Sequence, residues 1–116
     1  MRRVRSLVQL SAAAVVSVAL AGTAASAGQV KATPKTYIVT MQIVGFEPSV
    51  LTVKTGDRVT WVNKDLFPHT ATADDKAFDS KSVAPAGTWT FVARRPGTHT
   101  YACTFHPTMK GTIQVQ

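Results

Sequence analysis

The chain has 116 residues, of which 13 are Lys or Arg and 6 are Asp or Glu. That length suffices for one domain with a modest core, and nothing in the sequence indicates a second domain. Three arginines lie within the first five residues, so the chain after residue 27 has a net charge of only +4. This excludes the dense basic patch that nucleic acid binding requires, and we predict no nucleic acid partner.

Residues 1–27 are typical of a secretory signal peptide. A basic start, Met1–Arg5, precedes a mostly apolar run, Leu7–Leu20, and Ala25–Ala27 supplies the small residues of a cleavage site. The apolar run is shorter than the roughly 20 residues of a membrane-spanning helix, and an uncleaved anchor is the alternative interpretation. We predict cleavage after Ala27, a periplasmic or otherwise exported protein, and no stable membrane association.

The remaining sequence predicts a flexible lead over residues 28–35 and one domain over residues 36–116. Predicted strands, in chain order, span residues 37–44, 50–53, 58–63, 69–73, 88–93, 98–103 and 110–115. The first predicted strand is apolar at its odd and at its even positions, which predicts that other parts of the protein pack on both of its faces. Residues 74–87 predict a loop with at most one helical turn. Short strands at this spacing, without a sustained helical period, predict an antiparallel β-sandwich or barrel.

The single cysteine, Cys103, excludes an internal disulfide. Exported proteins fold in oxidising compartments, where cysteines usually pair. A lone thiol there indicates an intermolecular bridge, a reactive thiol or a metal ligand, and a buried structural thiol is the remaining alternative.

The residues around this cysteine favour a metal ligand. Cys103, His106 and Met109 follow one another at three-residue steps, and His69 stands after Pro68 at the start of a predicted strand. Two imidazoles, a thiolate and a weaker thioether form the ligand set of a blue-copper site. Zinc sites use Cys, His and carboxylates, so the thioether argues against a dedicated zinc site. Core residues and surface histidines without a metal are the other alternative.

From about residue 36 to residue 115 the sequence resembles the cupredoxins of the plastocyanin, pseudoazurin and amicyanin group. The matching segments are Gly45–Pro48, Val53–Asn63, Pro68–His69, Gly97–Cys103 and Met109–Gly111. The two-residue gaps on both sides of His106 most closely resemble the short amicyanin loop. The resemblance implies a Greek-key β-sandwich with one type 1 copper ion.

The resemblance also implies residue roles. His69, Cys103 and His106 would be the close copper ligands, and Met109 the long axial one. Asn63 would tie its strand to the copper loop near Thr104, with a turn asparagine as the alternative. His99 stands where the family often has an aromatic residue, and we expect a packed or partly exposed histidine that is not a ligand.

The function implied is a soluble electron carrier that cycles between Cu(II) and Cu(I) and passes electrons between larger redox proteins. It would not be an enzyme, and it would act as a monomer. Copper delivery or storage with the same ligands is the alternative. A hydrolase that uses Cys103 is disfavoured, since no helix start or third orienting group accompanies the thiol.

In this family the histidine of the copper loop reaches the surface, so we expect partner proteins to dock on an apolar patch around His106. Candidates for the patch, with ordinary packing as the alternative, are Phe67, Pro68, Phe105 and Pro107. Candidates for steering an acidic partner, with ordinary solvated charge as the alternative, are Lys64, Arg94, Arg95 and Lys110.

Overall fold

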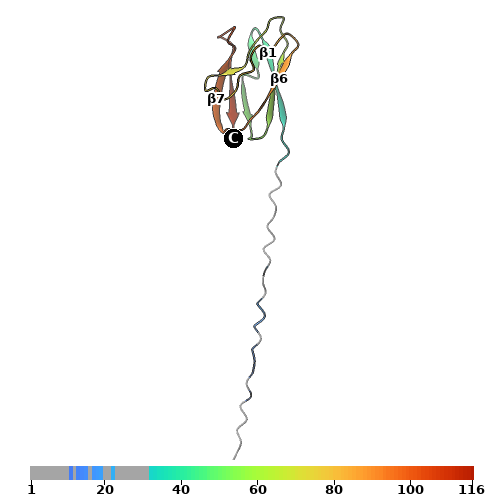
Figure 1. Cartoon of the computed structure of the whole chain (residues 1–116), viewed down its shortest axis with the longest axis vertical. Helices are drawn as coiled ribbons and strands as arrows, with labels where there is room; N and C mark the ends of the chain where they lie inside the picture. The colour runs from blue at the N-terminus through green and yellow to red at the C-terminus, as the bar shows by residue number, and fades with distance from the viewer. Residues whose placement is uncertain (1–10, 12, 16, 20–21, 23–31) are drawn as a thin grey trace, which may run out of the picture. The chain divides into compact units, whose positions relative to one another are not determined.

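The computed structural model describes residues 11, 13–15, 17–19, 22 and 32–116. The chain divides into two units, residues 1–30 and residues 31–116, and the second carries all the strands described below (Figure 1). The predicted cleavage site after Ala27 and most of the predicted signal peptide lie outside the described residues. None of the described residues belongs to a helix long and apolar enough to cross a membrane.

Within residues 32–116 the regular structure consists entirely of strands. In chain order these are β1 Thr36–Gln42, β2 Gly45–Glu47, β3 Val50–Val53, β4 Arg58–Asn63, β5 Thr72–Ala73, β6 Thr88–Val92, β7 Gly97–Ala102 and β8 Lys110–Val115. Residues 32–35 precede β1 and form no strand. The loop predicted over residues 74–87 contains turns and isolated bridges and no helical turn.

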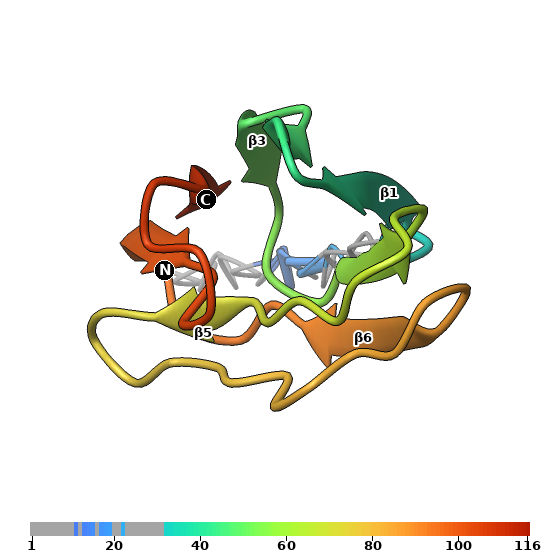
Figure 2. The same cartoon turned by 90° about the horizontal axis from the view of Figure 1, so that it is seen from above.

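Two four-stranded sheets form the body of this unit, with strand orders β2-β1-β4-β6 and β3-β8-β7-β5 (Figure 2). The predicted all-β sandwich is therefore confirmed, but the prediction of purely antiparallel sheets is wrong. β1 pairs with β4 in parallel, and β3 pairs with β8 in parallel. Both sheets are therefore mixed. In the first sheet, the chain passes through β2 and β3 after β1 and then enters β4 in the same direction as β1.

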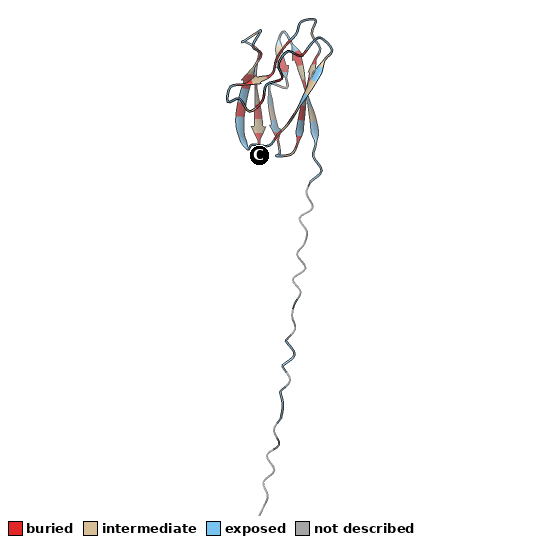
Figure 3. Cartoon of the chain, in the orientation of Figure 1, coloured by how far each residue is buried: buried red, intermediate tan, exposed pale blue. Residues whose placement is uncertain are grey.

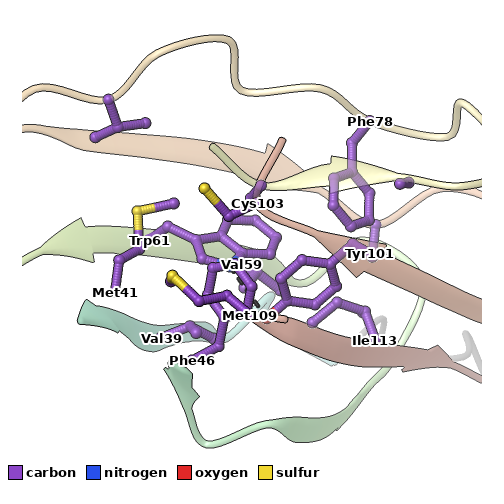
Figure 4. Packing of buried hydrophobic residues seen from close by; sticks show 14 of the residues in the cluster. Val39, Met41, Phe46, Val59, Trp61, Phe78, Tyr101, Cys103, Met109 and Ile113 are labelled. Carbon is purple, nitrogen blue, oxygen red and sulfur yellow. Dashed lines mark hydrogen bonds between the residues drawn. The ribbon is translucent and has the colours of Figure 1, made fainter. Parts of the chain in front are cut away.

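The core lies between the sheets and follows the period of two expected of strands. Trp61 of β4 and Tyr101 of β7 meet there edge to face at 5.5 Å between ring centroids, and the Trp61 indole donates a hydrogen bond of 3.2 Å to the Tyr101 hydroxyl. Buried and exposed residues alternate along the strands in Figure 3, and Figure 4 shows Cys103 and Met109 within the same apolar cluster.

The first strand is covered on one face only. Val39 and Met41 are fully buried, whereas Ile38 is 52% exposed and Ile43 and Val44 lie exposed beyond the strand end. The prediction of cover on both faces was wrong, because only the inner face of this sheet meets the other sheet. The chain turns at Ile43 and Val44 and returns as β2, a short strand that the sequence analysis did not predict.

The strand predicted over residues 69–73 is reduced to β5. His69 forms only an isolated bridge with Val83, and their backbone groups exchange hydrogen bonds of 3.2 and 2.8 Å. The Thr70 amide is directed to the sulfur of Cys103 instead of to a neighbouring strand. The site at this end of the sandwich thus uses backbone groups that a longer strand would need.

Candidate metal centre

The loop between β7 and β8 places three of the predicted ligands at one end of the sandwich. It is closed by two backbone hydrogen bonds, from the Cys103 amide to the Met109 carbonyl at 3.1 Å and from the Met109 amide to the His106 carbonyl at 2.8 Å. Because Ala102 and Lys110 are paired across the antiparallel strands, the loop has to curl tightly. Cys103, His106 and Met109 are consequently held near one another.

His69 reaches the same point from a different part of the chain. Its Nδ1 lies 3.7 Å from the Sγ of Cys103, and the Nδ1 of His106 lies 3.8 Å from that sulfur. The three candidate ligand atoms all lie within 4.8 Å of one another. The structure therefore brings together the two histidines and the cysteine that the sequence singled out.

These separations fit one small metal ion. The sulfur–nitrogen separations of 3.7 and 3.8 Å could be bridged by one ion, since metal–sulfur and metal–nitrogen bonds are about 2.3 and 2.0 Å long in zinc sites. A set of two histidines and one cysteine is typical of blue-copper sites. The donor set also matches, since thiolate ligands select Cu(I) and imidazoles suit copper in general.

Asp65 fixes the tautomer of His69. The Nε2 of His69 lies 2.8 Å from the Asp65 carboxylate, and this hydrogen bond, followed by one from the Leu66 amide, holds the pKa of Asp65 below its usual value. An ionised carboxylate only accepts, so the imidazole donates from Nε2 and leaves the Nδ1 lone pair free for a metal. The sequence analysis missed Asp65, although its place four residues before His69 was a usable signal.

The sulfur of Cys103 is fully buried, and burial raises its pKa. Hydrogen bonds to the sulfur outweigh that effect, first from the Thr70 amide at 3.3 Å and then from the His106 imidazole and the Phe105 amide, and the pKa is lowered to about 6. A thiolate is the form that binds metals. The site thus favours the ligating form of Cys103 near neutral pH.

Burial separates the four predicted ligands into two groups. His69 and Cys103 are 0% exposed and Met109 is 2% exposed, whereas His106 is only partly buried. Exposed apolar side chains on the neighbouring loops include Phe105, 51% exposed, Phe67, 55% exposed, and Leu66, 86% exposed. His106 is the one predicted ligand at a surface rich in apolar groups.

The predicted contact between Asn63 and the loop near Thr104 is wrong. The Asn63 amide nitrogen donates to the carbonyls of Phe67 and Val83 at 2.8 and 2.9 Å, and it thereby braces the segment that leads to His69. Thr70 makes the tie instead, since its hydroxyl accepts a hydrogen bond of 2.9 Å from the Thr104 amide. Its place directly after His69 was the signal for this role.

His99 lies apart from these ligands, as expected. It is 4% exposed on β7, and its ring nitrogens face the Asp75 carboxylate at 2.6 Å and the Arg95 carbonyl at 3.0 Å. Both partners are acceptors, so the ring donates to both only as an imidazolium. The histidine joins the loop after β5 to the turn before β7.

A comparison with protein families decides what kind of domain holds this site. The family model of the cupredoxin-like domain matches residues 10–115. The chain belongs to the cupredoxin-like family. The resemblance drawn from the sequence is thereby confirmed, and copper is the cofactor that this family membership and the His-Cys-His arrangement support.

Named relatives lie in the same group of cupredoxins. Plastocyanin from Scenedesmus fuscus is 37% identical over 84 residues, which cover 61% of this chain and 86% of that protein. Amicyanin from Paracoccus denitrificans is 29% identical over 84 residues, which cover 68% of this chain and 64% of that protein. The match thus spans somewhat less than two thirds of that amicyanin's length.

Solved structures agree with the fold of this cupredoxin. A Cu(I) structure of an amicyanin variant superposes with a TM-score of 0.65 and 27% identity, covering 70% of this chain and 82% of that one. A purple cupredoxin from Nitrosopumilus maritimus gives a TM-score of 0.63 at 24% identity, covering 68% of this chain and 98% of that one. The second likeness bears on the fold alone.

Proposed function

We propose that this cupredoxin is a small, exported, monomeric electron carrier, in which His69, Cys103, His106 and Met109 hold one type 1 copper ion. Copper bound there supplies a one-electron couple between Cu(II) and Cu(I). The carrier exchanges electrons with larger redox proteins. Its relatives named plastocyanin and amicyanin are electron carriers, not enzymes, and this supports the assignment.

The observation that carries the proposal is the unequal burial of the ligands. Three of them are at most 2% exposed, and the fourth, His106, is partly exposed. A closed set of ligands leaves little room for water or a substrate, which suits electron transfer more than catalysis at copper. One ligand near the surface gives electrons a short route to a docked partner.

The apolar surface supports docking at the same end. Leu66, Phe67 and Phe105 are exposed on the loops that carry His69 and His106. Brief redox encounters use small interfaces, for which a modest apolar patch suffices. We therefore add Leu66, which the sequence analysis did not name, to the proposed patch.

The ligands themselves also have structural support. Asp65 orients His69, and the Thr70 amide bonds to the sulfur of Cys103. These contacts hold the donor atoms in one geometry whatever the oxidation state of the metal. The signal peptide, cleaved after Ala27, would deliver the chain to the periplasm or another exported location.

Optical spectroscopy with Cu(II) tests the ligand set. The wild-type protein should develop an intense blue thiolate-to-copper band, and Cys103→Ser should abolish it. His99→Gln removes a histidine outside the ligand set, so that variant should keep the band. Absence of the band from the wild-type protein would refute the copper site.

A second measurement separates an electron carrier from a copper-delivery protein. A carrier should undergo reversible one-electron voltammetry and should keep its copper during prolonged incubation with a chelator. Rapid loss of Cu(I) to the chelator, together with sluggish electron exchange, would favour delivery or storage by the same ligands.

A further inference from the structure

β6 is the outermost strand of its sheet and has an open edge. The Asn63 amide donates to the Gly87 carbonyl, and the Ala93 amide donates to the Asp57 carbonyl, each at 2.9 Å. The residues just before and just after β6 therefore both bond toward β4. Because such bonds alternate along an antiparallel strand, the backbone groups of residues 88, 90 and 92 point the other way. Over residues 32–116, no backbone hydrogen bond joins that outer edge to another segment.

A groove with a volume of about 540 Å³ runs beside this edge. The side chains of Trp89 and Phe91, both half-buried, contribute apolar surface to it, and the loop at Lys76 and the turn at Arg94 and Arg95 form its other walls. That volume is within the range of ligand-binding clefts. The groove has space for a short stretch of extended chain against β6.

The charged side chains that line the groove, Lys76, Arg94 and Arg95, are all basic. The nearby Asp75 carboxylate is already engaged, by His99 at 2.6 Å and by the Arg95 guanidinium at 3.7 Å. Among the described residues, Lys76 and Arg94 form no ion pair. The groove therefore has positive charge available for a negatively charged occupant.

We infer that the groove binds an extended acidic segment of a partner protein, which adds as a further strand to the outer edge of β6. Strand addition satisfies the open backbone groups, and side chains at alternate positions give specificity. Glutamate or aspartate at those positions would meet Lys76 and Arg94, and this charge complementarity would favour acidic partners. Natural edge strands are usually blunted by Lys, Pro or bulges, and β6 has none of these between Thr88 and Val92.

This surface is distinct from the apolar patch at His106. β6 runs from Thr88, which pairs with Val62 near the copper loop, to Val92, which pairs with Arg58 at the other end of the sandwich. Arg94 and Arg95 follow at that far end. A partner in the groove would therefore leave the surface around His106 free, and the inference holds whether or not the protein carries electrons.

Nuclear magnetic resonance with a defined peptide tests the inference. The probe is an acetylated and amidated hexapeptide in which glutamate alternates with valine, added to the ¹⁵N-labelled protein at low ionic strength. We expect a Kd below about 1 mM, chemical-shift changes concentrated at residues 88–95 and Lys76, and slower amide hydrogen exchange at Thr88, Thr90 and Val92. A peptide with lysine in place of glutamate should not bind.

Two variants, each with a matched control, distinguish binding in this groove from general attraction of an acidic peptide to a basic protein. Arg94→Glu should weaken binding at least about tenfold, whereas Lys110→Glu, the same charge change on an exposed residue of β8, should leave it nearly unchanged. Thr90→Pro removes an outward N–H and should abolish the added protection. Because Thr90→Pro also removes the hydroxyl contact between Thr60 and Thr90, 2.7 Å long, Thr60→Val is its control.

Three results would overturn the inference. One is no detectable binding at millimolar peptide. Another is binding that Arg94→Glu and Lys110→Glu weaken equally, which would indicate unspecific attraction. The third is protection of the β6 amides that rises with protein concentration in the absence of peptide, because the occupant would then be a second copy of this chain.

Discussion

Asp65 is bound to His69 on the side of the ring opposite to the predicted metal position. Its negative charge increases the basicity of the imidazole and stabilises Cu(II) more than Cu(I). Asp65→Asn should therefore raise the reduction potential. A tenfold loss of Cu(II) affinity relative to Cu(I) would correspond to a rise of about 59 mV for a one-electron couple.

Cyclic voltammetry of the copper-loaded variant measures this shift. Glu47→Gln is the matched control, because it removes one exposed carboxylate from the end of β2, and the Glu47 side chain makes no hydrogen bond to the site. An unchanged or lowered potential in Asp65→Asn would show that the carboxylate does not influence the copper.

Cys103 should titrate as an unusually acidic thiol in the metal-free protein. Its pKa is lowered from 9.0 to about 6, because hydrogen bonds to the sulfur outweigh its burial. The folded state thus prefers the thiolate, so this group's contribution to stability is complete above pH 9 and is lost as the pH falls through about 6.

The thiolate absorbance in the ultraviolet, followed against pH, reports this titration directly. The midpoint should lie near 6 in the folded, metal-free protein and near 9.0 in denaturant. A midpoint near 9.0 in both states would mean that the Thr70 amide and the His106 imidazole do not stabilise the thiolate.

At the scale of single strands, β8 depends on a glycine that faces an aromatic ring. A Cβ added at Gly111 would lie 2.4 Å from the ring of Tyr101, which is 1% exposed on the paired strand β7. Gly111→Ala should therefore destabilise the fold by roughly 1–3 kcal/mol, because the packed ring cannot move without disturbing its neighbours. Chemical denaturation of the metal-free protein measures this change.

Thr112→Ala serves as the control for this position, since Thr112 points to the other face of the same strand and is only partly buried. Its effect should stay within about 0.5 kcal/mol. If Gly111→Ala were equally mild, the ring of Tyr101 would have more room than the structure indicates.

The strands differ in how well the sequence alone predicts them. β4 and β8 alternate cleanly between more and less buried residues, and their predicted ranges match the observed ones. β2 and β5 have three and two residues, which is too short for a periodic pattern. Their existence depends on β1 and β7, the partners to which they pair, and a local pattern does not reveal those partners.

For the molecule as a whole, the sequence predicts those ligands of the site that lie close to one another along the chain. Cys103, His106 and Met109 share one loop, so their spacing alone indicated a metal site. His69 is 34 residues from Cys103, and it could be joined to them only through the family resemblance. Asp65 and Thr70 stand close to His69 in the sequence, which was a signal, but only the folded backbone determines that the Asp65 carboxylate meets His69 and the Thr70 amide meets the sulfur of Cys103.

The partly exposed His106 should make the rate of electron exchange depend on the apolar end of the molecule. Leu66 is 86% exposed and Phe105 is 51% exposed beside the loops that carry the ligands. When two copies exchange an electron through these ends, Leu66→Glu or Phe105→Glu brings like charges together, which costs several kcal/mol in a close interface. The self-exchange rate should fall by about tenfold or more, because 1.4 kcal/mol already corresponds to a factor of ten.

Line broadening in mixtures of the Cu(I) and Cu(II) proteins measures that rate. The reduction potential and the blue band of both variants should stay close to those of the wild type, since neither side chain is a predicted ligand. Ile38→Glu is the control: Ile38 is 52% exposed on the outer face of β1, away from the copper loop, so this variant adds the same charge without crowding the encounter. Equal slowing by all three variants would mean that net charge sets the rate, and the apolar end would then have no special role in electron exchange.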